Sequence, residues 1–197
     1  MKIKLIIIIV FPLLIFLSGK DVSNSKIIRN TNQELTELVK DSLYVSKYEV
    51  TNGQYKVFLY HLKQNGEITK YSECLYDSVV WTKQFPGASN EPMMKYYHSH
   101  PAYSNYPASN LTYQSAKHYC AWLTDEYNSS QRRKFEQVLF RLPSEKEWLL
   151  AAKSSQYSIY PDNEERIRYH ANLKYRTGVL GNFDYASDGG LYATMKA

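Results

Sequence analysis

Two cysteines are the residues of this sequence best suited to redox or soft-metal chemistry. Thiolates select Cu(I), and an oxidase site of that kind needs two of them to converge. Cys74 and Cys120 are the only cysteines among the 197 residues, which excludes a disulfide-dense scaffold and a four-cysteine zinc site. Cys120 falls on the apolar face of a predicted helix, which favours a buried core thiol. A disulfide between the two cysteines is the alternative.

Two other pairs of residues have side chains capable of chemistry. His98 and His100 could supply imidazole ligands, but without a third ligand structural hydrogen bonding beside Pro101 is the favoured interpretation. Glu145 and Glu147 resemble a pair for acid–base catalysis. They fall in the first turn of a predicted helix, where carboxylates interact favourably with the helix dipole. We therefore predict no catalytic residue and no small-molecule substrate.

Composition indicates one globular domain. The chain is 44% hydrophobic and 22% charged, with a mean hydropathy of -0.50, values that argue against a disordered or fibrous protein. Its net charge is 24 − 19 = +5, and without Lys2, Lys4 and Lys20 it is 21 − 19 = +2. This mild charge excludes nucleic acid as an expected partner. The 19 tyrosines predict a loop-rich core, because their hydroxyls need hydrogen-bond partners.

The N-terminal residues indicate export. Residues 1–20 contain a basic start and an apolar run over residues 5–17, the pattern of a signal peptide or N-terminal anchor. Lys20 stands where a lipoprotein carries its lipid-bearing cysteine, so we expect no lipidation there. Residues 21–40 are polar and are predicted to form a tether or one short helix. We expect an exported bacterial protein, in the periplasm or cell envelope, that contacts membrane only through this N-terminal segment.

Hydrophobic periodicity places the elements that must position these side chains. Helices are predicted to follow the capping boxes Thr51-Asn-Gly-Gln54 and Ser144-Glu-Lys-Glu147, and a third to start at Thr112. The last of these helices along the chain is expected to turn Trp148, Ala151 and Ala152 inward. No helix is predicted between residues 67 and 110. Strands are predicted at residues 43–50, 79–81 and 138–142.

Four blocks carry a resemblance to a known family. They are Lys47-Tyr-Glu-Val-Thr-Asn52, His100-Pro101 to Tyr106-Pro107, Ala116-x-x-Tyr119-Cys120-x-Trp122 and Arg141-Leu-Pro-Ser-Glu-Lys-Glu-Trp148. Their order and residues resemble the formylglycine-generating enzyme and sulfatase-modifying-factor family. The resemblance implies an α+β domain over residues 41–197, of the formylglycine-generating-enzyme type, which is a variant of the C-type-lectin-like architecture. Residues 81–103 are especially similar to gliding-motility lipoproteins of this family.

The resemblance also suggests a function. Family members continue into a closing half with a Gly-Asn-x-Trp-Glu-Trp block, and the enzymes carry a copper-binding cysteine pair there; neither precedes Ala197. We therefore expect an incomplete family domain with apolar surface exposed near its C-terminal end, no copper, and a non-catalytic envelope binding or assembly role with protein partners. The alternative is the N-terminal fragment of an oxidase that converts a substrate cysteine to formylglycine.

A calcium site is the one metal site that the resemblance implies. Family members hold Ca²⁺ with an Asn-aliphatic pair and a later Asp-Gly turn, and Asn172, Leu173, Asp188 and Gly190 match this pattern. Oxygen ligands from side chains and backbone carbonyls suit the ion. Asn and Asp-Gly are also common turn residues, so ordinary turns are the alternative.

Overall fold

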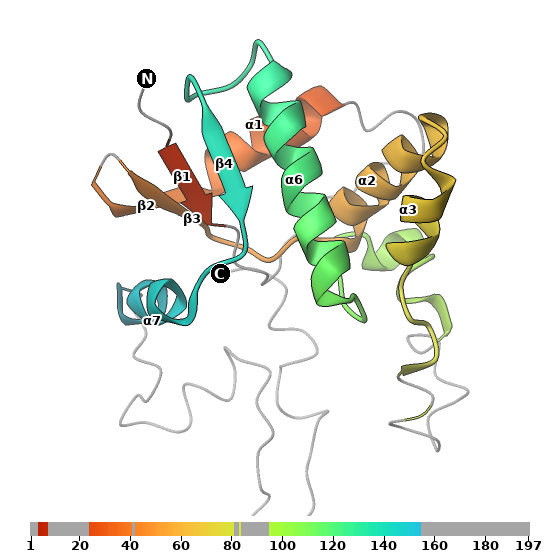
Figure 1. Cartoon of the computed structure of the whole chain (residues 1–197). Coiled ribbons are helices and arrows are strands. Elements are labelled where there is room, and N and C mark those ends of the chain that lie inside the picture. The colour runs from red at the N-terminus through yellow and green to blue at the C-terminus, as the bar shows by residue number, and fades with distance from the viewer. Residues whose placement is uncertain (1–3, 8–23, 41, 81–82, 84–94, 155–197) are drawn as a thin grey trace, which may run out of the picture.

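The chain forms an α+β fold in a computed structural model. The structure describes residues 4–7, 24–40, 42–80, 83 and 95–154 (Figure 1). Within these ranges, no helix has the length and apolarity that crossing a membrane requires. The elements, in chain order, are β1 (Lys4–Ile7), α1 (Asn24–Glu34), β2 (Leu35–Val39), β3 (Leu43–Ser46), α2 (Asn52–Gln64), α3 (Ile68–Glu73), the 3-10 helix η2 (Pro101–Tyr103), α6 (Tyr113–Ser129), β4 (Val138–Arg141) and α7 (Glu145–Ser154).

Helix α2 begins where its capping box predicts. The Oγ1 of Thr51 accepts the Gln54 N–H at 3.2 Å, and the Gln54 side chain accepts the Thr51 N–H at 2.8 Å. These two bonds satisfy donors that the first turn of a helix leaves unpaired. The helix ends before Gly66, whose φ of 74° lies in the left-handed region that glycine adopts without strain. The capping box of α2 is therefore confirmed.

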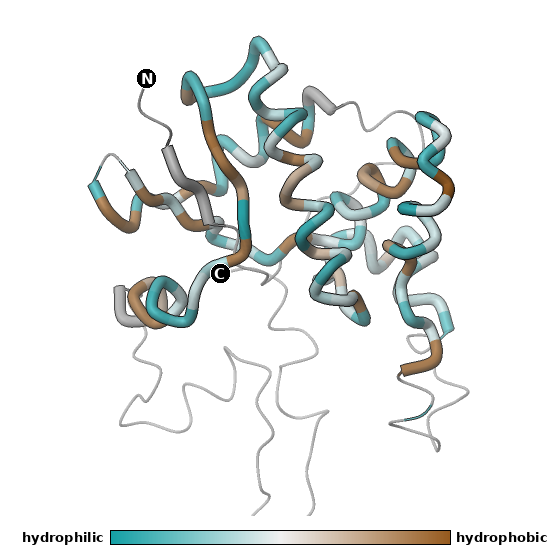
Figure 2. Tube along the Cα trace, in the orientation of Figure 1, coloured by the Kyte–Doolittle hydropathy of each residue, from teal (hydrophilic) through white to brown (hydrophobic). Residues whose placement is uncertain are grey.

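Aromatic side chains join α2 to α6. The Phe58 ring lies 5.7 Å from that of Tyr119 and 5.5 Å from that of Trp122, and the Tyr55 ring stacks at 5.7 Å from Tyr119. Hydrophobic and hydrophilic residues alternate along both helices in Figure 2, as expected of helices with one buried face. The predicted helix at Thr112 is also confirmed, because the Thr112 Oγ1 accepts the Ser115 N–H at 3.0 Å.

A mixed sheet lies on the other side of α6 from α2 and α3 (Figure 1). Its strand order is β2-β3-β1-β4, with β1 parallel to both β3 and β4, and β2 antiparallel to β3. The backbone of Lys4–Ile7, which we predicted to belong to a signal peptide or anchor, is therefore an inner strand of this structure. An export role for residues 1–20 remains a prediction.

The outer edge of β4 is closed by α6 and not by another strand. Asn128 accepts the Val138 N–H and donates to the Val138 carbonyl, both at 2.9 Å. Thr124, one helical turn earlier, accepts the Phe140 N–H at 2.9 Å. Four residues of helix rise about 6 Å, and two residues of strand rise about 6.6 Å. The two side chains therefore match the spacing of the strand's outward backbone groups.

Residues 24–39 belong to the folded part of the chain. We predicted a tether or one short helix here, but α1 is followed at once by β2, and Ile27 and Ile28 are buried in the main core. The backbone N–H of Lys47 donates to the Glu34 carbonyl at 2.8 Å, which joins the end of α1 to the end of β3. Packed structure thus begins before the predicted boundary at residue 41.

Two other predicted elements differ from the structure. Val79 is in a turn and Val80 has a helical conformation. The predicted strand at residues 79–81 was therefore wrong over its described part. Helix α3 lies in the stretch where no helix was predicted, and it continues the chain reversal that Gly66 starts. Strands β3 and β4 were found, each shorter than predicted.

The orientation predicted for α7 was partly wrong. Trp148 is 41% exposed, whereas Ala151 packs against Leu43 and Val45 of β3. The neighbouring Leu149 and Leu150 are exposed as well. Apolar side chains therefore do lie on the surface of the last described helix.

Candidate functional site

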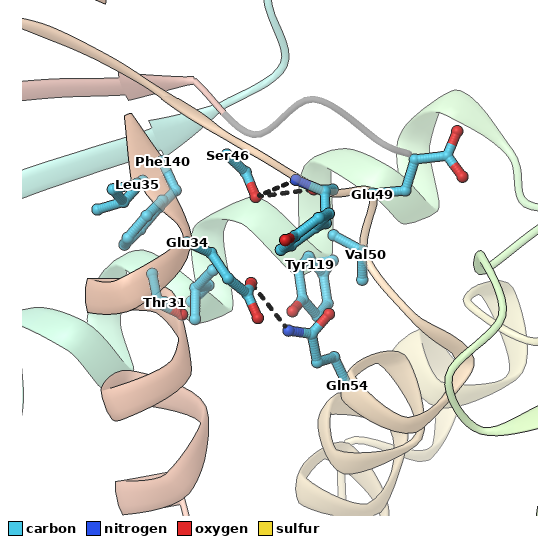
Figure 3. Close-up of a pocket in the computed structure, with 11 residues that line it drawn as sticks. Thr31, Glu34, Leu35, Ser46, Glu49, Val50, Gln54, Tyr119 and Phe140 are labelled. Carbon is cyan, nitrogen blue, oxygen red and sulfur yellow. Dashed lines mark hydrogen bonds between the residues drawn. The ribbon is translucent and has the colours of Figure 1, made fainter. Parts of the chain in front are cut away.

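A small polar recess lies where α1, α2 and α6 meet. The side chains of Glu34, Gln54 and Tyr119 point toward one another there (Figure 3). The Gln54 Nε2 donates to the Glu34 carboxyl at 3.5 Å, while its Oε1 accepts the Thr51 N–H of the α2 cap. We call this site the Glu34 recess. It links the last residue of α1 to the first turn of α2.

The environment of the Glu34 recess favours neutral side chains. Burial raises the pKa of Glu34, and the hydrogen bond from Gln54 opposes that rise only partly. Burial also raises the pKa of Tyr119 well above its usual value, with the negative charge of Glu34 contributing. Both groups carry protons more readily here than in water, because a low dielectric disfavours their charged forms.

The size of the Glu34 recess limits what it can hold. Its volume is about 20 Å³, enough for about one water molecule. A carboxyl, an amide and a phenol can together hydrogen-bond one such group. Glutamate and tyrosine can act as nucleophiles in their ionised forms, but burial disfavours those forms for Glu34 and Tyr119, and the recess has no room for a substrate beside them. The recess can therefore hold a small polar group, and its described residues do not form a catalytic constellation.

Glu49 is a second buried carboxyl, close to the Glu34 recess. It is 8% exposed, and burial raises its pKa to about 9. Figure 3 shows its carboxyl pointing away from Glu34 and Gln54. It therefore does not act with Glu34 as a carboxylate pair, and the expected state of Glu49 at neutral pH is protonated.

The two cysteines are free and buried, as the core interpretation of Cys120 predicted. Burial raises the pKa of Cys120 to about 12. Cys74, the C-cap residue directly after α3, also has a raised pKa, because burial outweighs its hydrogen bonds with Ser115 and Tyr55. Cys74 is 0% and Cys120 5% exposed, so neither thiol is open to a copper ion from solution. The alternative of a disulfide between them was wrong.

The histidine pair has structural roles, as the favoured interpretation predicted. His100 accepts the Ala102 N–H at 3.1 Å and caps η2. The Nε2 of His98 lies 3.2 Å from the Ser109 carbonyl and 3.4 Å from the Ser109 Oγ. A carbonyl accepts hydrogen bonds only, so Nε2 carries the proton. His98 therefore cannot take a proton from Ser109 through that nitrogen.

Glu147 likewise serves the structure. Its carboxylate makes a two-pronged contact with the Arg141 guanidinium, at 2.8 and 2.6 Å, and accepts the Ser144 N–H at 2.8 Å. The hydrogen bonds from Arg141, and secondarily those from Ser144, lower the pKa of Glu147 to about 2. A carboxylate held ionised in this way is a poor general acid. It completes the predicted capping box of α7.

The four predicted calcium ligands cannot be placed. Asn172, Leu173, Asp188 and Gly190 lie outside the described residues. Across residues 4–154, in the parts that the structure describes, no group of three or more His, Cys, Asp or Glu side chains could hold a metal ion. The calcium site remains a prediction.

Sequence reasoning missed the Glu34 recess because residues 21–40 were predicted to be a tether or one short helix outside the folded domain. A signal was present: Ile27, Ile28, Thr31 and Leu35 have the spacing of one helical face, and the first three are buried. That spacing predicts α1 and its packing. It does not predict that Glu34 meets Gln54 and Tyr119, which come from two other helices.

Comparison with known proteins identifies the family. The described residues form an α+β domain in which the candidate polar side chains make structural hydrogen bonds and are not assembled into a catalytic centre. Residues 16–194 match the Sulfatase-modifying factor enzyme 1-like domain. The chain belongs to this family, which confirms the predicted resemblance at that level. No curated protein and no solved structure matches it.

Proposed function

We propose that this chain is a non-catalytic binding or assembly module of the bacterial cell envelope, built on a sulfatase-modifying-factor domain. The observation that carries the proposal is the state of its two thiols. Both lie in the apolar core, Cys74 at 0% and Cys120 at 5% exposure, so neither sulfur is open to a copper ion or to a substrate. His98, His100 and Glu147 stabilise loops and a helix end, which leaves surface recognition as the function best supported.

The finer assignments belong to the same proposal. We infer a C-type-lectin-like variant of the fold and a relationship to the gliding-motility lipoproteins of the family. The second inference rests on the resemblance of residues 81–103, of which residues 81–82 and 84–94 lie outside the described residues. Envelope proteins are the proposed partners, reached by export through residues 1–20.

A direct assay separates this function from the oxidase alternative. The purified chain is incubated with Cu(I), oxygen and a sulfatase-type cysteine peptide, and the peptide mass is followed. We expect an unchanged peptide, also with a Cys120→Ser variant as the matched control. Conversion of the cysteine to an aldehyde by the unaltered chain, with loss of activity in Cys120→Ser, would contradict the non-catalytic proposal.

The export part of the proposal has its own test. Residues 1–30 are fused to an alkaline phosphatase that needs disulfides, which form outside the cytoplasm. We expect activity in bacterial cells, and loss of activity when Lys2 and Lys4 are both replaced by Glu. Equal activity of the two fusions, or none from either, would argue against a signal in this segment.

We also propose calcium as a structural ion. The proposal rests on the match of Asn172, Leu173, Asp188 and Gly190 to the family pattern and on the preference of Ca²⁺ for oxygen ligands. Calorimetric titration of the full chain should show calcium binding that is weakened in Asp188→Ala and kept in the control Asp184→Ala. Identical titrations for the three proteins would contradict the site.

A further inference from the structure

Strand β1 fills a slot between two strands, each of which has another partner on its far side. Because β1 is parallel to both β3 and β4 (Figure 1), these two strands lie about 10 Å apart, twice the spacing of neighbouring strands. Strand β3 pairs with β2 on its far side. The far side of β4 is bonded to Asn128 and Thr124 of α6. Neither strand can therefore close the gap without losing its other partner. We call this gap the β1 slot.

The residues of β3 and β4 that face β1 in the ladder define what the β1 slot accepts. All three β3 residues are 8% exposed, and the partners of Ile6 on both strands belong to the main core. A strand that is parallel to both neighbours and lies in a covered sheet carries a continuous aliphatic run. The β1 slot therefore requires such a run, with an apolar residue at the central position. The register is Leu5 with Leu43 and Leu139, Ile6 with Tyr44 and Phe140, and Ile7 with Val45 and Arg141.

The sequence contains such a run only in the segment that has the composition of an export signal. Three consecutive Val, Ile or Leu residues occur within residues 5–17 and nowhere in residues 21–197. Removal of the signal would therefore vacate the β1 slot, and residues 21–197 contain no equivalent run to refill it. A second processed copy of the chain would lack one as well. An equivalent strand would then have to come from a different protein.

We propose that the β1 slot of the processed chain is a strand-acceptor site, into which a partner protein inserts an extended aliphatic segment parallel to β3 and β4. Main-chain hydrogen bonds to both edges would provide affinity, as in other cases of β-strand addition. An empty slot would leave two strand edges unpaired, which is a hazard for aggregation. This inference rests on the export part of the proposed function, because processing removes residues 1–20, and it defines the chemistry of the envelope partner.

A site-specific protease can separate β1 from the folded full chain. Its recognition sequence is inserted after Lys20, the chain is cut, and the released fragment is exchanged for a labelled peptide. The peptide Lys-Ile-Lys-Leu-Ile-Ile-Lys-Lys repeats residues 2–7 and ends in two added lysines for solubility. We expect saturable binding to the cut chain, measured by fluorescence anisotropy. The uncut chain is the matched control and should bind far more weakly, because its own β1 remains tethered beside the slot.

Two further measurements establish where the peptide binds. The Ile6→Asp peptide should bind at least about tenfold more weakly, because a charge would enter the apolar core. The Leu139 and Arg141 amides, which face β1 because adjacent strand residues direct their backbone groups to opposite edges, should lose hydrogen-exchange protection when the fragment is removed. The peptide should restore it. The Val138 and Phe140 amides donate to α6 and should stay protected throughout.

Four results would overturn the inference. They are no binding to a cut chain that still melts cooperatively, equal binding to the uncut chain, equal binding of the Ile6→Asp peptide, and protection of Leu139 and Arg141 that persists after the fragment leaves. The last result would mean that another part of the chain fills the β1 slot.

Loss of cooperative melting in the cut chain would itself provide a test. The unaltered peptide should then restore cooperative melting and the Ile6→Asp peptide should not, and failure of the unaltered peptide would overturn the inference. Export is tested separately by the phosphatase fusion. A failure of peptide binding would therefore leave the export proposal and the non-catalytic role standing.

Discussion

Different kinds of contact stabilise two regions of the molecule. One region is the pair of helices α2 and α6, and the other is the four-stranded sheet. The helices begin at their own capping residues and meet through interlocking rings, with Phe58 fully buried. The strands have only four or five residues each, and β4 pairs with β1 on one side and with α6 side chains on the other. The helical pair thus depends on local signals and apolar packing, whereas the sheet, apart from its neighbouring strands β2 and β3, depends on hydrogen bonds between distant segments.

Removal of residues 1–20 should produce the largest difference in stability between the sheet and the helix pair. Strand β1 lies between β3 and β4 and pairs with both. Adjacent residues of a strand direct their backbone groups to opposite edges, so the Leu139 and Arg141 amides face β1. In a chain that begins at Asp21, their protection from hydrogen exchange should be lost, whereas amides within α2 and α6 stay protected.

The same strand provides the control for this truncation. The Val138 and Phe140 amides donate to Asn128 and Thr124 of α6 and should remain protected. Unchanged protection of Leu139 and Arg141 would show that the sheet does not need β1. That result would agree with residues 1–20 being a removable export signal.

Phe58→Ala tests the helical side of the comparison. The ring is 0% exposed and contacts three other rings, so its loss should lower the free energy of unfolding by about 3–5 kcal/mol. Tyr60, in the same helix, is 60% exposed, and Tyr60→Ala should change it by less than about 0.5 kcal/mol. Similar denaturant midpoints for the two variants would contradict the aromatic core.

Asn128→Ala should have a smaller effect, confined to the sheet. It leaves a donor and an acceptor of Val138 unpaired, which should lower the free energy of unfolding by about 1–3 kcal/mol. The Val138 amide should also exchange faster. Asp125→Ala, at an exposed position of the same helix, is the control. An unchanged Val138 exchange rate would mean that α6 does not close this edge.

Glu49, in the segment between the sheet and α2, should make the free energy of unfolding depend on pH, and Glu49→Gln should remove this dependence. Because the pKa of Glu49 is raised from 4.5 to about 9, the unfolded chain loses this proton first as pH rises. The stability of the native chain should therefore decline between these pH values, by at most about 1.4 kcal/mol per pH unit from this group. The variant should be more stable than the native chain by about 1 kcal/mol or more at pH 8.

The difference should shrink at pH 5, which lies only about half a pH unit above the ordinary pKa of 4.5, because little of the penalty for proton loss has built up there. Urea titrations at the two pH values measure it, with Glu136→Gln at an exposed position as the control. A difference of equal size at both pH values would indicate a packing effect and not the titration of Glu49.

The sequence alone determined the features that depend on neighbouring residues. Thr51 with Gln54, Thr112 with Ser115, and Ser144 with Glu147 act within a single helical turn, so their spacing is sufficient to predict them. The apolar stripe of α6 predicted the burial of Cys120 for the same reason. The family blocks were also readable, because each is a short contiguous segment.

Only the tertiary structure decided what depends on contact between distant segments. Glu34 meets Gln54 and Tyr119 because three helices converge, and β1 acquires its place from pairing with β3 and β4. The apolar run that contains β1 has the same composition as a signal peptide, so periodicity could not separate the two interpretations. Trp148 has a helical spacing that predicts burial, yet its exposure depends on which element packs against α7. Local sequence specifies how a helix starts, and long-range packing specifies which of its residues are covered.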